Sequence, residues 1–437
     1  MLKQEEDYKI KLADLEKNLL EALATAEGDL LENTLLIESL TQTKEASHEI
    51  SNALSASAEA SATLDARREA YRGFSRDGSR LYFLVRDLVL VNPMYQVSLA
   101  SFVKLFEAAL RDASIDAGAK LEERLARLTP LLERLVFFFV GRGLFKADRC
   151  MFALHLVHGM HAEHFLEREW ELFTGELAPD SGSDTAAAQL NGDDANSNSG
   201  PCRPRGLPSW ASLDRAVACA DMAAHLGPLV RKLDLENGTR WNRWARSPEC
   251  EREFPPEAVR ECTPFQRVLI TRCFRPDRLM SALNAFACEV LQVPSLSPPP
   301  LSFASLYSIE TEARTPTLLI TTAGADPSKE LADFAASVVG ADHYAALAMG
   351  GGTHDLAMQL LADASVAGSW LCFQNLHLVV AWLPALEKAL AALAPHDCFR
   401  LWLTTEPHGA FPRVLLQQAL KVTFELPPVQ EECLFTI

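Results

Sequence analysis

One loop in the sequence has the position of a phosphate-binding loop but lacks its residues. The motif G-x-x-x-x-G-K-[ST] surrounds phosphates with backbone N–H groups, reaches their oxygens with Lys and holds Mg²⁺ with a hydroxyl. Here a short apolar strand, TLLITT, is followed by AGADPSKE. Counting from Gly324, Lys329 stands where the second Gly belongs and Glu330 stands where the Lys belongs. Asp326 adds negative charge, and Pro327 removes a backbone donor.

A nucleotide-hydrolysing site of this kind also needs a carboxylate at the end of a buried strand to hold Mg²⁺. The apolar stretch SWLCFQNLH offers only the neutral amides of Gln374 and Asn375 at that corner. Both halves of a metal–phosphate site are therefore missing, and we expect no catalytic residue, no metal and no functional nucleotide cofactor. The degenerate pocket is predicted to consist of Gly324, Asp326, Lys329, Glu330, Gln374 and Asn375.

Three consecutive glycines, at positions 350 to 352, precede a helical stretch and could form an anion-binding nest. A simple glycine turn is the favoured interpretation, and binding of a nucleotide base without turnover stays open. A second candidate is a series of histidines spaced by three residues. An i, i+3 spacing can place two imidazoles on one helical face, but Gly159 is expected to interrupt the helix, and no carboxylate or Cys stands at matching spacing. A helix end with surface histidines is favoured over a metal site for His155, His158, His161 and His164.

The elements that position these loops alternate between strands and helices. Strands are predicted in TLLITT, YAALAM, SWLCFQNLH, FRLWLTTE and LKVTFEL, with helices in SKELADFAASVVG, HDLAMQLLADA and VAWLPALEKALAAL. Such alternation predicts a mostly parallel sheet with helices on both faces. Ligand sites in these sheets lie at the carboxyl ends of the strands. The loops of interest are therefore residues 322–327, 350–353, 374–377 and 404–408.

Most of the first 293 residues are predicted to be helical. Residues 1–72 carry apolar and small residues at steps of four and three, which predicts an antiparallel coiled-coil hairpin with its turn near residues 28–33. The seam of the second arm is rich in Ser, Thr and Ala, so we expect it to lean on another domain; a self-standing hairpin is the alternative. Residues 78–175 and 209–293 read as packed helices, whose tryptophans are expected to be packing residues. The tract 176–206 lacks large apolar residues and is predicted to be a disordered insertion.

The composition limits the class of function. The chain has 437 residues, 48% hydrophobic and 23% charged, with a net charge of −17. This acidic balance argues against nucleic-acid or anionic-membrane binding. No apolar run approaches the roughly 20 residues of a membrane span, and the charged N-terminus does not resemble a signal peptide. The ten scattered cysteines contain no C-x-x-C pair, which favours free thiols inside the cell.

Successive segments resemble the C-terminal part of the motor ring of dynein heavy chains, especially the class that serves intraflagellar transport (the second cytoplasmic class). They include LLENTLLIESLTQTK, LFKADRCMFALHLVHGMH, FRPDRLMSALNAFA, AGADPSKEL and WLCFQNLHLVVAWLPALEK, and they occur in the family's order from about residue 2 to residue 428. The tract 176–206 and the last residues, 429–437, depart from the family's pattern.

The resemblance implies an α + α/β architecture. Residues 1–72 would be the coiled-coil strut of the fifth AAA+ module, and residues 73–130 its helical small domain. Residues 131–300 would lead into the sixth module, whose degenerate P-loop-type core would be residues 315–428, followed by an atypical tail. The sequence would then be a fragment or partial gene model, with ATP and Mg²⁺ bound only in modules upstream.

The resemblance also implies a function in an ATP-driven, minus-end-directed microtubule motor of the cytoplasm and cilium. This part would transmit force without hydrolysing ATP. Implied partners are the rest of the heavy chain, the intermediate and light intermediate chains, and microtubules through the stalk, with no nucleic acid and no membrane insertion. The alternatives are a stand-alone pseudo-ATPase scaffold that binds partners through its coiled coil, and an active enzyme with unusual ligands.

Overall fold

The computed structural model describes residues 34–112, 121–177, 207–297 and 302–425, together with parts of 6–21. It divides into two compact units, Met1–Arg76 and Asp77–Ile437, and each is described by itself. In the first unit, the second arm of the predicted hairpin forms a single long helix, α2 (Thr34–Ala70). The predicted turn at 28–33, most of the tract 176–206 and the tail 429–437 lie outside the described residues. The coiled-coil pairing therefore stays a prediction.

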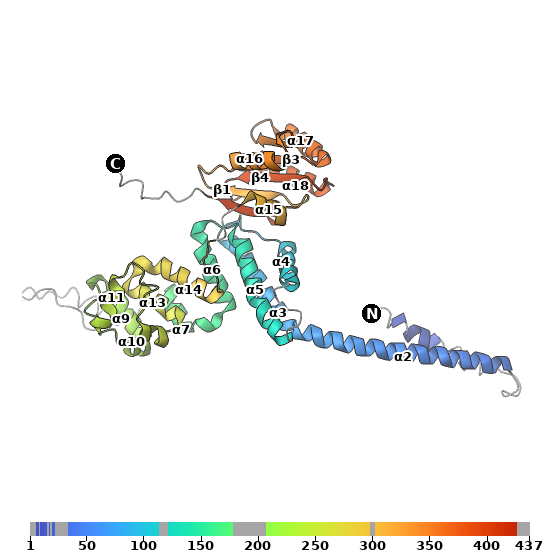
Figure 1. Ribbon diagram of the computed structural model, residues 1–437, viewed down its shortest axis with the longest axis horizontal. Coiled ribbons are helices and arrows are strands. Elements are labelled where there is room, and N and C mark those ends of the chain that lie inside the picture. The colour runs from blue at the N-terminus through green and yellow to red at the C-terminus, as the bar shows by residue number, and fades with distance from the viewer. Residues whose placement is uncertain are drawn as a thin grey trace, which may run out of the picture. The chain divides into compact units, whose positions relative to one another are not determined.

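Two helical groups precede the sheet (Figure 1). The first group lies around α5, which packs against α4 and α6. Its elements are α3 (Arg72–Asp87), η1 (Leu88–Leu90), α4 (Leu99–Arg111), α5 (Leu121–Gly141), α6 (Lys146–Met160) and η2 (Ala162–His164), whereas α7 (Glu167–Thr174), next along the chain, packs against α13 of the second group. The second comprises η3 (Leu213–Arg215), α9 (Ala216–His225), α10 (Gly227–Leu233), α11 (Gly238–Arg246), α12 (Pro256–Glu261), α13 (Pro264–Phe274), η4 (Pro276–Arg278) and α14 (Leu279–Leu291).

The second helical group has an aromatic core. Trp241 and Trp244 of α11 are at most 1% exposed, and Trp210 stacks on Trp241 with ring centroids 5.8 Å apart. The segment FRPDRL turns the chain from α13 into α14. There Arg275 donates to the carbonyl oxygens of Ala245 (2.6 Å) and Ser247 (3.0 Å), which lie at the end of α11. The tryptophans are thus packing residues, as the sequence predicted. Arg275 of the FRPDRL segment links the end of α13 to the end of α11 by hydrogen bonds.

The C-terminal part of the chain is a five-stranded, wholly parallel sheet in the order β2-β3-β4-β1-β5. Its strands are β1 (Thr317–Thr321), β2 (Tyr344–Ala348), β3 (Trp370–Gln374), β4 (Arg400–Thr405) and β5 (Leu420–Phe424). The central strands are buried along almost their whole length, as expected where helices cover both faces. The alternating pattern therefore predicted the class and direction of this sheet correctly.

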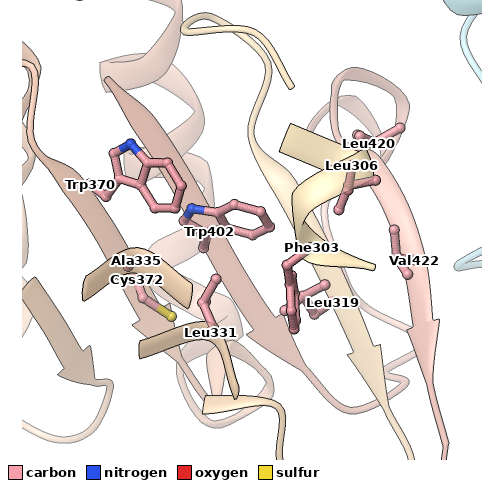
Figure 2. Packing of buried hydrophobic residues seen from close by; sticks show 10 residues of the cluster. All are labelled: Phe303, Leu306, Leu319, Leu331, Ala335, Trp370, Cys372, Trp402, Leu420 and Val422. Atoms are coloured by element: carbon pink, nitrogen blue, oxygen red, sulfur yellow. The ribbon is translucent and has the colours of Figure 1, made fainter. Parts of the chain in front are cut away.

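Helices α15 (Phe303–Ile309) and α16 (Ser328–Val338) cover one face of the sheet. Phe303 and Leu306 of α15, with Leu331 of α16, pack against the buried Trp370 and Trp402 of the strands, as Figure 2 shows. The other connections, α17 (His354–Ala367), η6 (Leu376–Trp382), α18 (Leu383–Ala392) and α19 (Arg413–Gln418), run in the opposite direction across the sheet. Because parallel crossovers are right-handed, they lie on the other face.

The helix expected over residues 380–393 is present as α18, which begins at Leu383 with a proline in its first turn. It follows η6, whose backbone leaves helical geometry at Val379 (φ −127°, ψ 37°), before the expected start. Gly159 lies inside α6, and the helix end expected at this glycine falls one residue later, at Met160, with His161 as the capping residue. A Cβ at Gly159 would lie 2.4 Å from Cδ1 of Leu84, so this glycine lets α3 and α6 approach closely.

Candidate functional site

The loop after β1 forms a tight turn around Gly324. The N–H of Ala325 donates to the carbonyl oxygen of Thr322 over 2.9 Å, and Gly324 has a φ of +85° inside that turn. A left-handed φ at the third residue of a turn favours glycine, because other side chains are strained there. The N–H of Thr322 also donates to the carbonyl oxygen of Phe424, at 3.3 Å. Gly324 therefore shapes a chain reversal that is tied to β5.

A carboxylate of the protein itself lies at the N-terminus of α16. The side chain of Asp326 accepts a hydrogen bond from the backbone N–H of Ser328 at 2.9 Å, and hydrogen bonding with Ser328 holds the pKa of Asp326 below its usual range. The free N–H groups at a helix N-terminus form the usual position for a bound phosphate. Here one of them is occupied by Asp326, and Pro327 has none to offer. An incoming phosphate would meet a negative charge and fewer donors.

The two residues that replace the motif's Gly and Lys both point to solvent. Lys329 and Glu330 are exposed residues in the first turn of α16. A phosphate-binding lysine must reach the phosphate from the position that Glu330 occupies in the motif. The described loop brings Gly324 and Asp326 together near the start of α16, and it leaves Lys329 on the helix surface.

The end of β3, which is separated from β1 by β4, carries neutral side chains. Gln374 ends β3, and its carbonyl oxygen accepts from the N–H of Met349 at 2.9 Å. Asn375 is exposed and left-handed (φ 61°), and its N–H donates to the Thr404 hydroxyl at 3.2 Å. Neither amide can supply the carboxylate that Mg²⁺ requires at this corner.

Threonine hydroxyls and one imidazole satisfy the backbone at this edge of the sheet. Thr321 donates to the carbonyl oxygen of Thr405 at 3.3 Å, and Thr405 donates to that of Glu406 at 2.9 Å. The N–H of Glu406 in turn donates to Nδ1 of His377 at 3.1 Å. We did not predict this network, although the loops that contain it were singled out. The threonines at the ends of the adjacent parallel strands β1 and β4 were the feature of the sequence that could have indicated it.

The glycine run forms a turn closed by Thr353. The N–H of Gly350 donates to the Thr353 hydroxyl (3.1 Å), and that hydroxyl donates back to the carbonyl oxygen of Gly350 (3.0 Å). Gly352 is left-handed, with a φ of +87°. The arrangement is that of a glycine turn at the start of α17.

The histidines make different contacts, although the rings of His161 and His164 lie 6.2 Å apart. His158 stacks on Trp170 with ring centroids 3.9 Å apart, whereas Nε2 of His161 contacts the buried Glu133 carboxylate at 2.9 Å. All four are partly buried, so their expected surface location was wrong. No group of three or more His, Cys, Asp or Glu side chains in the described part of the chain has the arrangement of a metal site. None of the described helices is both long and apolar enough to cross a membrane.

A second notable region joins the first helical group to the sheet. Arg142, which follows α5, forms a two-pronged ion pair with Glu310, which follows α15, and its guanidinium lies 5.1 Å from the ring centroid of Phe139. Lys104 of α4 forms a second pair with Glu312, at 2.7 and 2.9 Å. These contacts join helices and sheet that lie far apart in the sequence.

The same turn covers the open edge of β5. The carbonyl oxygen of Arg142 accepts from the backbone N–H of Thr423 at 2.9 Å and from its hydroxyl at 3.0 Å. The N–H of Lys146 donates to the Glu425 carboxylate at 2.7 Å. Gly143 lies close to this strand, because a Cβ there would be 3.3 Å from Cβ of Lys421. Because the N–H of Thr423 is bonded to the carbonyl oxygen of Arg142, this part of the β5 edge is not free to pair with another strand.

The parallel sheet, with a glycine turn between its first strand and the following helix, defines a P-loop-type α/β module. Comparison with known families agrees: the model of the dynein heavy chain region D6 P-loop domain matches residues 312–423, and that of the ATP-binding dynein motor region matches residues 1–50. The first match covers the whole sheet except the last residue of β5.

Individual relatives are similar over almost the whole chain. It is 44% identical to cytoplasmic dynein 2 heavy chain 1 of Mus musculus, 43% to that of Homo sapiens and 41% to that of Chlamydomonas reinhardtii. Each alignment covers 98% of this chain. The chain therefore belongs to the dynein heavy-chain family. It spans about a tenth of the length of the curated relatives that it matches.

Proposed function

We propose that this chain is a structural, force-transmitting part of a dynein motor and does not itself hydrolyse ATP. The observation that carries the proposal is the Asp326 carboxylate at the N-terminus of α16, where a phosphate would have to lie. The exposed Lys329 and Glu330, and the neutral Gln374 and Asn375, support it. A site with repulsion at the phosphate position, and with neutral amides at the end of β3 where the Mg²⁺-binding carboxylate is required, lacks both electrostatic terms on which phosphoryl transfer depends.

A titration of the chain with Mg-ATP tests this part of the proposal. Calorimetry is expected to show no saturable heat at nucleotide concentrations up to about 1 mM, which corresponds to a binding free energy weaker than about −4 kcal/mol. Micromolar binding, or release of phosphate above the buffer rate, would overturn it. Asp326→Asn serves as a companion variant: a gain of binding on removing that charge would identify the carboxylate as the obstacle.

The transmitting role is supported by the junction between the first helical group and the sheet. A rigid-body movement passes between two elements only if their contacts persist during it. The Arg142–Glu310 pair, the Lys104–Glu312 pair and the bonds between Thr423 and the Arg142 carbonyl oxygen join these elements by side chains and backbone together. ATP turnover elsewhere in the heavy chain would move the sheet and these helices as one body.

On this view the chain contributes to a minus-end-directed microtubule motor for retrograde intraflagellar transport, located in the cytoplasm and cilium. The names of the relatives, cytoplasmic dynein 2 heavy chain 1, support this assignment. Residues 1–72 would be a strut, residues 73–130 and 131–300 helical domains, and residues 315–428 a degenerate AAA+ core. The partners would be the rest of the heavy chain, intermediate and light intermediate chains, and microtubules.

The decisive measurement uses an intact dynein 2 heavy chain that carries this region. Arg142→Met should leave basal ATPase activity within about twofold, because the residue lies far from any hydrolysing site in this scheme. It should weaken the dependence of microtubule affinity on nucleotide state. If that dependence is unchanged while the variant region is folded, the junction does not transmit force.

A further inference from the structure

Two thiols from different helices meet in the core of the second helical group. Cys219 lies on α9 and Cys273 on α13, and these two helices pack against each other. The S–H of Cys273 donates a hydrogen bond to Sγ of Cys219. Both residues are buried, with 4% and 5% of their surface exposed. The fold therefore brings together two cysteines whose positions in the sequence gave no indication of a pair.

Hydrogen-bonded thiols are already close to the geometry of a disulfide. Little more than side-chain rotation is needed to bring such sulfurs within bonding distance. Cys150 of α6 and Cys288 of α14 offer a comparison, because these helices also pack against each other and the charge of one thiol affects the other. Those two described thiols are not hydrogen-bonded to each other, and Cys398 is exposed. The contact between Cys219 and Cys273 is thus a specific one.

The hydrogen bond gives the two sulfurs different reactivity. It lowers the pKa of the Cys219 thiol, because an S–H donor stabilises the thiolate that accepts from it. The same bond, together with burial, raises the pKa of Cys273. The thiolate is the nucleophilic form of cysteine. Cys219 is therefore the sulfur that reacts first with an oxidant, and Cys273 is placed to react with the product.

Helix α9 depends on its neighbours for stability. It has 10 residues, and no side chain caps its N-terminus. Helices shorter than about 12–15 residues are marginal on their own in water, so α9 relies on its contacts with α10 and α13. Local opening of such a helix would expose Cys219 to a molecule as small as hydrogen peroxide. A covalent bond to α13 would oppose the same opening.

We propose that Cys219 and Cys273 form a reversible disulfide when the chain meets a peroxide. The Cys219 thiolate attacks a peroxide oxygen and breaks the O–O bond, which gives a sulfenic acid and a hydroxide that takes up the proton lost by Cys219. The Cys273 sulfur then attacks the sulfenic sulfur and breaks its S–O bond; the departing hydroxide takes the Cys273 proton and leaves as water. Two thiols are oxidised to one disulfide, and one hydrogen peroxide is reduced to two waters. The bond locks α9 on α13, and the inference does not depend on the proposed force-transmitting role.

Peptide mapping of the whole chain tests the bond directly. After treatment with hydrogen peroxide, the remaining thiols are alkylated and the chain is digested with trypsin without reduction. Cys219 and Cys273 then lie in peptides 216–231 and 273–278, each with one cysteine. We expect these peptides to be joined, two hydrogens lighter than their sum, and to separate again with dithiothreitol. Joining of Cys150 to Cys288, the control pair, should be at least about tenfold lower.

Hydrogen exchange measures the lock. Oxidation should slow amide exchange in α9 at least about tenfold and leave α17 unaffected. Cys219→Ala and Cys273→Ala should each abolish this slowing, whereas Cys398→Ala, which removes an exposed thiol, should retain it. Circular dichroism checks that the variants are folded, and the peptide map of the unmodified chain needs no variant. Absence of the joined peptides when Cys398 is oxidised, equal joining of the control pair, or slowing that either folded alanine variant at position 219 or 273 retains would overturn the proposal.

Discussion

The Arg142–Glu310 pair gives the sharpest test of how the helices hold the sheet. Its two residues are separated by 168 positions in the sequence, so it can form only in the folded chain. The side chains are 17% and 27% exposed, and both guanidinium nitrogens contact the carboxylate. Arg142→Met removes the charge and the two hydrogen bonds but keeps an unbranched side chain over Phe139.

The loss of stability expected for Arg142→Met follows from how deeply the Arg142–Glu310 pair is buried. Exposed ion pairs contribute about 0.2–1 kcal/mol, whereas breaking a fully buried pair costs about 3–5 kcal/mol because one charge is left without a partner. The intermediate exposure of Arg142 and Glu310 places the cost of Arg142→Met at about 2 kcal/mol. About 1 kcal/mol of this should appear as coupling to Glu310 in a double-mutant cycle.

The assay is urea unfolding of four proteins: the unmodified chain, Arg142→Met, Glu310→Gln and the double variant. Tryptophan fluorescence reports on the sheet, where Trp370 and Trp402 are fully buried, together with the second helical group, where Trp241 and Trp244 are. Lys104→Met and Glu312→Gln make the matched control cycle. That pair joins the same elements, but its side chains are 64% and 56% exposed, so its coupling should stay below about 0.5 kcal/mol. A coupling between Arg142 and Glu310 no larger than the control would refute the reasoning.

Three further outcomes are expected. The hydrogen bond with Glu133 raises the pKa of His161. The stability that protonated His161 contributes is therefore complete below the unfolded pKa of about 6.5 and is lost as pH rises through the higher folded pKa. The unfolding free energy should be lower at pH 8 than at pH 6 for this reason, and His161→Asn should abolish the difference. Burial raises the pKa of Glu169, whose Oε2 is buried without a hydrogen-bond partner, so its charge destabilises the fold above pH 4.5; Glu169→Gln should increase the unfolding free energy at pH 7 by about 1 kcal/mol, and an unchanged or lower value would contradict this. Gly368→Ala should cost about 2 kcal/mol in denaturant unfolding, because Gly368 is left-handed (φ +74°) and a Cβ would lie 2.7 Å from the His396 ring; Gly409→Ala, with open space around it, should cost less than about 0.5 kcal/mol.

Local patterns predicted most of the sheet. Each of the five strands falls within its predicted stretch, because short apolar runs bounded by turn residues leave few other structures for the chain. The edge at which the degenerate pocket lies also followed from the parallel direction alone. Gly324, Asp326 and Asn375 lie in loops at that edge, and Gln374 ends β3 there.

Features that depend on contacts between distant segments were not predictable. Gly159 was read as a helix breaker from its low helix propensity, whereas the close approach of Leu84 explains it. The kink at Val379 lies in η6, just before the expected helix, where η6 contacts β4, and such a contact leaves no periodic signal. Nothing in the spacing of charges singles out Arg142 and Glu310, because a pair across 168 residues has no sequence period.

The polar groups at the carboxyl edge of the sheet explain how a nucleotidase fold can work without a nucleotide. In an active site the N–H groups of the loop await phosphate oxygens, so the loop is fully bonded only when the ligand is present. Here the N–H of Ser328 is bonded to Asp326, that of Asn375 to Thr404 and that of Glu406 to His377. These bonds are all made within the protein and need no nucleotide. The proposed force-transmitting role would benefit from this, since a loop that loosened without its ligand would absorb the movement that the sheet has to pass on.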